Sequence, residues 1–335
     1  MNRSAPAVEI YGTLGPACAD EEILTEMIRN GMTGLRLNLS HTTLRACAPQ
    51  LYMVRRAEER CGVSLRLLMD MQGPEVRIGD LPRPLDFAAG DTLRLGEGGI
   101  PVPAEALECM LPGQELLLDD GKLALTVTAF HDTWAEARAV RGGTLLSRKS
   151  LALPGREIRL PAMTAEDREN LAVAKELGIH GLMQPFVRGG DDLRTIRAAA
   201  EKVGFPELRI LAKIENRAGM AALPELLPLS DEIVIARGDL GNAVPLWELP
   251  GVQKDIAAAC RGAGVPFVVV NQMLASMEKN PVPTRAEVSD IFNAVLDGAA
   301  GVMLTGETAA GRYPAEAVGY MARTVRAALD HLRRA

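Results

Sequence analysis

The chain has 335 residues, of which 47% are hydrophobic and 24% are charged, a composition typical of a soluble globular protein with a large core. Its formal net charge of -6 argues against a nucleic-acid-binding protein, because contact with a phosphate backbone usually requires a positive face. The five cysteines are scattered and include no CxxC pair, which fits a reducing cytoplasm better than a disulfide framework or a zinc site. The N-terminus has no apolar h-region and no stretch elsewhere approaches about 20 uninterrupted apolar residues, so we expect neither a signal peptide nor a membrane span.

Short aliphatic runs recur along the chain, and most of them precede a segment with helical periodicity. The runs are residues 8–14, 34–40, 64–71, 178–186, 208–215, 231–239, 266–274 and 299–307. The helical segments are residues 20–31, 43–62, 191–204, 218–227, 252–264, 285–298 and 314–332. Eight strands that mostly alternate with helices predict an α/β fold of the (β/α)8 TIM-barrel type, in preference to an open doubly wound sheet.

Residues 74–155 have a different pattern. Alternating segments at 91–98, 114–130 and 134–146 are separated by Gly and Asp-Gly turn signals. They predict a small all-β domain inserted after the third strand, with residues 1–73 and 156–335 forming the barrel. Without the insertion about 255 residues remain, close to the roughly 250 of a TIM barrel. Because loops after barrel strands open onto the active-site face, we expect the insertion to act as a lid over a bound substrate.

Polar residues at the C-terminal ends of the predicted strands are the candidate site residues. Lys213 and Glu215 lie two apart, so their side chains point to the same side of a strand end. Glu215 and Asp239 offer hard oxygen ligands on adjacent strands, enough to hold Mg2+ or Mn2+ if substrate and water complete the shell. The other candidates at strand ends are Arg36, Asn38, Ser40, Asp70, Glu75, Arg77, Asn271, Gln272, Thr305 and Glu307.

The candidates share a chemical theme. Arg36, Lys213 and Arg77 are cations suited to phosphate or carboxylate. "GDLG" could open a helix, so the amides of Gly238 and Asp239 could bind an anion. A divalent metal, cations and amides together indicate phosphoryl transfer or an enolate intermediate. For any single candidate, a structural salt bridge or a helix cap is as good an explanation as a functional site. The candidates come from the ends of six strands, and this convergence favours a functional site.

The same residues carry a resemblance to the pyruvate kinase family. The successive motifs are "TLGPAC", "GMTGLRLNLSH", "MDMQGPEVRIG", "AKIENRAG", "VIARGDLG", "NQMLASMEKNPVPTRAEVSD" and "NAVLDGAAGVMLTGETAAGRYPAEAV". They follow the family's order and span nearly the whole predicted barrel. The resemblance implies a glycolytic kinase that depends on Mg2+ (or Mn2+) and K+ and transfers a phosphoryl group between phosphoenolpyruvate and ADP, giving pyruvate and ATP.

The resemblance also implies a role for each matching residue. Glu215 and Asp239 would bind Mg2+, and Lys213 would stabilise the phosphoryl group in flight. Arg36 would contact the phosphates, and the amides of Gly238 and Asp239 would hold the substrate carboxylate. The remaining implied residues are Asn38, Ser40, Asp70 and the carbonyl of Met71 for K+, Glu75 for K+ dependence, and His41, Arg77 and Lys149 for the nucleotide.

Two positions depart from the family pattern near the carbon end of the substrate. Asn271 stands where the family usually has Thr, and Pro185 stands where it usually has Ser. The family's threonine lies near the enolate carbon that must be protonated, and an amide cannot relay a proton as a hydroxyl can. Thr305 keeps a hydroxyl on the eighth strand, where the family usually has Ser. These changes predict a slower pyruvate kinase or a kinase for a different 2-oxo acid or enol phosphate.

Further departures concern the size of the chain. The insertion is shorter than the family's usual lid, and the sequence ends after the helical segment at 314–332. The family usually continues there into a domain that carries the effector site and part of the tetramer interface. We therefore expect no sugar-phosphate activation of the usual kind, and a homo-oligomer stays an open alternative.

Two other classes of function compete with this interpretation. A metal-dependent lyase acting through a pyruvate enolate would need Glu215 and Asp239 but has no use for Lys149 or a nucleotide. A non-catalytic sensor could keep the ligand pocket without turnover, although the intact Lys213 and Arg36 argue against such decay. In every case we expect small-molecule ligands, with neither nucleic acid nor membrane as a partner.

Overall fold

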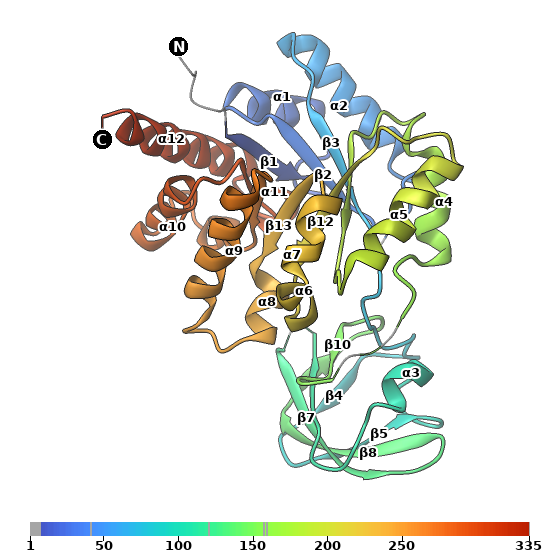
Figure 1. The fold of residues 1–335 in the computed structure, drawn as a ribbon. Helices are drawn as coiled ribbons and strands as arrows, with labels where there is room; N and C mark the ends of the chain where they lie inside the picture. The colour runs from blue at the N-terminus through green and yellow to red at the C-terminus, as the bar shows by residue number, and fades with distance from the viewer. Residues whose placement is uncertain (1–7, 41, 120, 157, 159, 335) are drawn as a thin grey trace. The chain divides into compact units, whose positions relative to one another are not determined.

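The computed structural model describes residues 8–40, 42–119, 121–156, 158 and 160–334 (Figure 1). The chain divides into two units, Met1–Gly73 with Ala162–Ala335 and Pro74–Pro161. Each unit has a hydrophobic core of its own. No helix in the described residues is long and apolar enough to cross a membrane.

Eight parallel strands of the first unit close into a barrel in the order β1, β15, β14, β13, β12, β11, β3, β2. Because β1 pairs with both β15 and β2, none of these eight strands has a free edge. The predicted TIM barrel is confirmed. The strands are β1 (Glu9–Thr13), β2 (Gly34–Asn38), β3 (Arg66–Asp70), β11 (Gly181–Gln184), β12 (Arg209–Ile214), β13 (Glu232–Ala236), β14 (Phe267–Val270) and β15 (Gly301–Met303).

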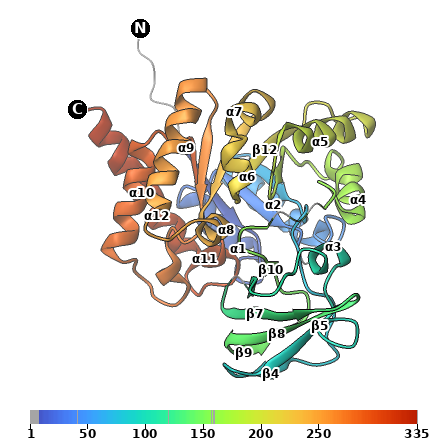
Figure 2. The ribbon, with the colours of Figure 1, turned by 60° about the horizontal axis from the view of Figure 1, so that its bottom comes forward.

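Helices surround the strands of the barrel (Figure 2). The long ones are α1 (Glu21–Arg29), α2 (Ala48–Cys61), α4 (Ala165–Ala174), α5 (Gly190–Lys202), α9 (Leu249–Ala263), α10 (Arg285–Leu296) and α12 (Pro314–Leu332). The short ones are α6 (Arg217–Ala221), α7 (Leu223–Leu226), α8 (Arg237–Ala243), α11 (Gly306–Ala309) and the 3-10 turns η1 (Leu227–Leu229) and η2 (Ala275–Glu278).

The helical segment expected at 218–227 is broken in the structure. It forms α6, α7 and η1 in succession in place of one helix. Pro224 and Pro228 explain the breaks, because proline lacks the amide hydrogen that a continuing helix needs.

Tyr11 fills the interior of the barrel at the middle of β1. Its side chain is buried and packs in an apolar layer with residues such as Leu68 and Val234. The strands on either side of β1 carry glycine opposite the ring. A Cβ on Gly34 of β2 would overlap the ring, and one on Gly301 of β15 would lie 3.1 Å from it. These two glycines therefore make room for the largest side chain of the layer.

The second unit is antiparallel. A five-stranded sheet has the order β10, β6, β7, β8, β5, and a separate pair joins β4 with β9. Its elements are β4 (Leu85–Phe87), β5 (Thr92–Gly96), α3 (Ala104–Leu107), β6 (Glu115–Leu118), β7 (Leu123–Phe130), β8 (Trp134–Arg141), β9 (Gly143–Leu145) and β10 (Leu151–Ala152). Buried aliphatic side chains such as Leu116, Leu125 and Ala137 form its core.

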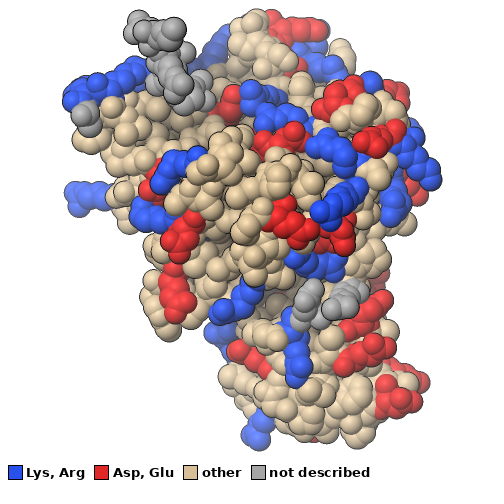
Figure 3. Space-filling model, viewed as in Figure 1, with Lys and Arg blue, Asp and Glu red and all other residues tan. Residues whose placement is uncertain are grey.

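Acidic and basic side chains are intermixed over the face of the molecule shown in Figure 3. Several exposed pairs are short, such as Arg194 with Asp191 at 2.6 Å and Lys254 with Asp297 at 2.8 Å. Each exposed pair contributes only about 0–1 kcal/mol. The stability of the fold therefore depends mainly on the buried cores.

The packing around Tyr11 gives a prediction for stability. Gly34→Ala is expected to lower the free energy of unfolding by about 1–3 kcal/mol, because the added methyl overlaps the buried ring. Gly262→Ala is the control, since a Cβ at this position in α9 meets nothing within 4 Å. The control should be neutral or stabilising by up to about 1 kcal/mol. Equal effects of the two changes in urea unfolding would contradict this account.

Candidate active site

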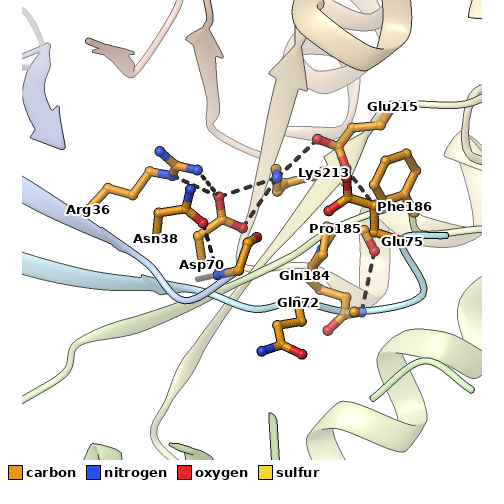
Figure 4. A network of polar contacts seen from close by, with 12 residues as sticks. Arg36, Asn38, Asp70, Gln72, Glu75, Gln184, Pro185, Phe186, Lys213 and Glu215 are labelled. Carbon is orange, nitrogen blue, oxygen red and sulfur yellow. Dashed lines mark hydrogen bonds and ion pairs between the residues drawn. The ribbon is translucent and has the colours of Figure 1, made fainter. Parts of the chain in front are cut away.

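Lys213 is the centre of a buried charged cluster at the C-terminal end of the barrel. It lies near the end of β12, and its Nζ is 3.0 Å from Oε1 of Glu215, the residue that follows this strand. The same Nζ lies 3.2 and 3.3 Å from the two carboxylate oxygens of Asp70, the last residue of β3 (Figure 4). Two strands separated by β11 thus converge on one ammonium group.

Arg36 of β2 completes the cluster from the other side of Asp70 (Figure 4). Its Nε and Nη2 lie 2.7 and 2.6 Å from Oδ2 of Asp70. Its Nη1 donates to the hydroxyl of Thr13 at 3.3 Å. Asp70 therefore lies between two cations, and the charges of Arg36, Lys213, Asp70 and Glu215 sum to zero.

The pairing in this cluster outweighs the effect of burial on both central groups. Burial alone would raise the pKa of Asp70, but Lys213 and Arg36 hold that pKa below its ordinary value. Burial alone would lower the pKa of Lys213, but Asp70 and Glu215 raise it above its ordinary value. Both groups are therefore charged at neutral pH. A positive ammonium is thus fixed at the end of the barrel where active sites of this fold lie.

Glu215 directly follows β12, and Asp239 lies three residues after the end of β13, the next strand of the barrel. Ile214 pairs with Ile235 in register, so the residues after them leave the sheet side by side. The Oε2 of Glu215 accepts a hydrogen bond of 2.8 Å from the amide of Phe186. Asp239 is partly exposed in the first turn of α8.

The donor set at this point fits part of a divalent-metal site. Both candidate ligands are carboxylates, which Mg2+ and Mn2+ prefer. In the part of the chain that the structure describes, no three or more His, Cys, Asp or Glu side chains gather to hold a metal ion. Substrate oxygens and water would therefore have to supply the remaining ligands.

Asn271 lies against the start of α8. Its Oδ1 accepts a long hydrogen bond of 3.4 Å from the amide of Gly238, one of the two amides expected to bind an anion. Asn271 and Gln272 have φ angles of 78° and 56°, unusual for residues other than glycine. Arg237 holds this bend, because its Nη2 donates to the carbonyl of Asn271 at 2.8 Å while its Nη1 pairs with Asp290 at 2.6 Å.

Arg237 was not among the residues expected from the sequence. The motif "VIARGDLG" contains it, but its partners lie on the following strand end and on α10. It fixes the position of Asn271 relative to α8. No periodicity in the sequence predicts these contacts.

The residues expected to bind K+ lie on the neighbouring strands β2 and β3. Asn38 pairs in register with Asp70 (Figure 4). The Oδ1 of Asn38 accepts from the amide of Ser40 at 3.2 Å. The amide of Met71 donates to the carbonyl of Met183 at 3.2 Å, which fixes the backbone directly after Asp70.

Thr305 lies at the end of β15, and its hydroxyl is 3.3 Å from Oε2 of Glu307. Glu307 is buried and accepts from the amides of Thr305 and Leu274 at 2.7 and 2.9 Å. It thus joins the loops after β14 and β15. Glu307 therefore has a structural role in this geometry.

The motif "PTRAE" forms a capping box at the start of α10. The hydroxyl of Thr284 accepts from the amide of Glu287, and the carboxylate of Glu287 accepts from the amide of Thr284. The same carboxylate accepts from the amide and hydroxyl of Ser276 at 2.7 and 2.6 Å. The family resemblance at this motif thus reflects the capping of α10.

Two of the residues expected to bind nucleotide lie outside the first unit. Arg77 and Lys149 belong to the second unit, where Arg77 pairs with Glu75 at 2.6 Å and Lys149 pairs with Asp119 at 2.8 Å. Burial raises the pKa of Asp119, but Lys149 and Lys122 hold it below its ordinary value. His41 lies outside the described residues.

A cavity of about 350 Å³ lies at the opposite end of the barrel. It is lined by Arg66, Arg209 and Glu232 among others. Arg209 pairs with Glu232 at 3.5 Å, and Arg66 pairs with Glu9 at 3.4 Å. The basic side chains of this cavity are thus neutralised by acidic side chains of the protein. The Lys213 cluster differs, because further acidic side chains and backbone amides lie at the neighbouring strand ends.

Comparison with known proteins decides the family. Residues 5–318 match the family model described as pyruvate kinase, barrel domain. The chain belongs to the pyruvate kinase family. The resemblance inferred from the motifs is confirmed, and this is a family of phosphotransferases.

Curated relatives agree with this assignment. A pyruvate kinase of Chlamydia pneumoniae is 37% identical over 93% of this chain and 66% of its own length. Pyruvate kinases of Aeropyrum pernix and Agrobacterium vitis are each 38% identical, over 94% and 96% of this chain and 69% and 68% of their own lengths. The chain thus spans about two thirds of the length of the curated relatives it matches.

The capping box at α10 gives a prediction about pH. Burial raises the pKa of Glu287, but hydrogen bonds from Ser276 and Thr284 hold it below its ordinary value. A pKa lowered by folding adds stability above the unfolded-state pKa, and this stability is lost as the pH falls through the folded-state value. Glu287→Gln should therefore cost about 1 kcal/mol at neutral pH and less in acid.

Urea unfolding of both proteins at about pH 7 and about pH 3.5 measures this difference. Glu316→Gln, an exposed glutamate in the first turn of α12, serves as the control and should cost less than about 0.5 kcal/mol. A cost of Glu287→Gln that is the same at both pH values would show that its carboxylate charge has no part in the cap.

Proposed function

We propose that the chain catalyses Mg2+- and K+-dependent phosphoryl transfer between phosphoenolpyruvate and ADP, giving pyruvate and ATP. The observation that carries the proposal is the buried Lys213 ammonium between Asp70 and Glu215. It lies at the active-site end of a barrel that belongs to the pyruvate kinase family. A fixed cation next to a carboxylate metal ligand is the arrangement that phosphoryl transfer requires.

Lys213 suits the migrating phosphoryl group for a physical reason. That group spreads negative charge over its oxygens in the transition state. Because carboxylates from β3 and β12 already hold the ammonium, it needs little reorganisation as the charge develops. The carboxylates of Asp70 and Glu215 raise its pKa, so it is protonated at neutral pH. Arg36 adds a second cation, which would contact the phosphates.

Glu215 and Asp239 are the residues that would hold the divalent metal, which supplies further stabilisation of negative charge when bound. The amides of Gly238 and Asp239 would orient the substrate carboxylate. Thr305 is the hydroxyl that would take part in protonating the enolate carbon. The other proposed assignments are K+ at Asn38, Ser40, Asp70 and the Met71 carbonyl, and nucleotide at His41, Arg77 and Lys149.

The wider assignments are proposals of the same kind. We place the protein in the cytoplasm, as a glycolytic enzyme whose second unit acts as a lid. The reducing environment implied by its scattered cysteines supports that location, and none of the five forms a disulfide. Its partners would be ADP or ATP and phosphoenolpyruvate or pyruvate, with a homo-oligomer as an open alternative.

A second candidate function is the same transfer to or from a different 2-oxo acid or enol phosphate. One observation favours it: the carboxamide of Asn271, which accepts from the Gly238 amide, stands where the family usually has a hydroxyl near the enolate carbon. A ligand carboxylate would have to displace this contact or share it. A lyase acting through a pyruvate enolate would have no use for ADP, so a calorimetric test of ADP binding distinguishes that alternative.

A screen of phosphoryl donors and 2-oxo acid acceptors, with Mg2+ and K+, tests both candidates by nucleotide conversion. Lys213→Met should lower kcat by about 100-fold to 1,000-fold, because one preorganised transition-state contact contributes about 3–4 kcal/mol. The control is Lys254→Met, which removes an exposed lysine on α9 and should leave kcat unchanged.

The outcomes of the screen separate the candidates. Turnover with phosphoenolpyruvate and ADP that requires Lys213 supports the first. Faster turnover of another pair supports the second. No conversion of any pair above the Lys213→Met background would refute both.

A further inference from the structure

Asp167 is a fully buried carboxylate in the first turn of α4. Its Oδ1 accepts from the amide of Gln72 at 2.9 Å. Its Oδ2 accepts from the amides of Gly73 and Thr164, each at 2.9 Å. Among the described residues no lysine or arginine forms an ion pair with it. Backbone amides alone therefore stabilise this buried charge.

A helix cap explains only part of this arrangement. Thr164 and Asp167 form a capping box, in which each side chain accepts from the other residue's amide. The bonds from Gln72 and Gly73 are additional, and they come from a segment more than ninety residues away in the sequence. The carboxylate thus has a second task besides capping α4.

The partners of Asp167 lie on both segments that connect the two units. Gln72 and Gly73 are the last residues before the second unit, which spans Pro74–Pro161. Thr164 lies just after the chain returns to the first unit at Ala162. One carboxylate therefore joins the outgoing segment to the returning one.

Neighbouring contacts hold the same two segments on the first unit. The Nε2 of Gln184 donates to the carbonyl of Ala162 at 2.7 Å. The Nε2 of Gln72 donates to Oε2 of Glu166 at 2.6 Å and to the carbonyl of Leu39 at 3.3 Å. Both segments are therefore anchored by the first turn of α4 and the end of β11.

We propose that Asp167 is a positioning residue, which holds residues 72–73 and 162–164 at fixed places on the end of the barrel. Gln72 directly follows Asp70 and Met71, so the same carboxylate also fixes the backbone that carries two proposed K+ ligands. Movement of the second unit would then begin beyond Gly73 and end before Ala162. The part that concerns turnover and K+ rests on the proposed function, whereas the anchoring does not.

Amide hydrogen exchange of the full chain tests the anchoring without any need for activity. In the wild-type protein the amides of Gln72, Gly73 and Thr164 should be protected together. Asp167→Asn should speed exchange at Gln72 and Gly73 by about 10-fold or more. The NH2 group of the new asparagine would face backbone N–H groups, which are also donors, so hydrogen bonds to this side chain would be lost. Unprotected amides at Gln72 and Gly73 in the wild-type protein would overturn the proposal even if the variant does not fold.

Thr164→Ala is the matched control, since it removes the cap hydroxyl but leaves the carboxylate in place. It should speed exchange in the first turn of α4 and leave Gln72 and Gly73 within about 2-fold of the wild-type rate. If Asp167→Asn leaves exchange at residues 72–73 unchanged, or if both variants raise it equally, Asp167 acts only as a helix cap and the proposal is wrong.

Enzyme assays give a second measurement wherever the wild-type protein shows turnover. Asp167→Asn should raise the half-saturating K+ concentration by about 10-fold, as expected for a residue that orients a ligand from outside the coordination shell. Thr164→Ala should leave that concentration within about 2-fold of wild type. An unchanged K+ requirement in Asp167→Asn would overturn the link to the cation loop. Absence of wild-type turnover would count against the proposed function alone.

Discussion

The ammonium of Lys213 between the carboxylates of Asp70 and Glu215 is the interaction on which the rest of the site depends. A buried charge is tolerated only when other charges and hydrogen bonds compensate it. Here the compensation comes from β2, β3 and the end of β12, strands that are distant in the sequence but that pairing through β11 brings close together in the barrel. Removing one partner would leave an uncompensated buried charge, which typically costs about 3–5 kcal/mol. The packing of these barrel strands and the charges of the site therefore depend on each other.

Buried carboxylates take two different roles in this molecule, and their neighbours decide which. Asp70 and Glu215 face cations, so they fix positive charge where a phosphoryl group would pass. Asp167 and Glu307 accept mainly from backbone amides, and the half-buried Glu287 accepts from amides and hydroxyls alike, so these three fix loops and helix ends. A motif such as "PTRAE" can thus identify a family while its glutamate has a structural role. Residue type alone does not separate the two roles.

Much of the fold follows from the sequence, because each barrel strand is a short aliphatic run and most of them precede a helical pattern. The shared direction of Lys213 and Glu215 also follows from their spacing of two. The breaks among α6, α7 and η1 could have been predicted from Pro224 and Pro228. Arg237, Asp119 and Asp167 could not, because their partners come from distant segments. The position of Asn271 against Gly238 likewise depends on a contact between the segments that follow β13 and β14, and no local sequence pattern predicts that contact.

The central claim is that Lys213 provides the positive charge for phosphoryl transfer while sharing Glu215 with a divalent metal. Titration with Mn2+, followed by the electron paramagnetic resonance of the free ion, tests this sharing directly. In Lys213→Met, Glu215 loses a competing cation, so Mn2+ should bind at least as tightly as in the wild-type protein while turnover is lost. Mn2+ affinity that falls together with turnover, in a variant that still folds, would contradict the account.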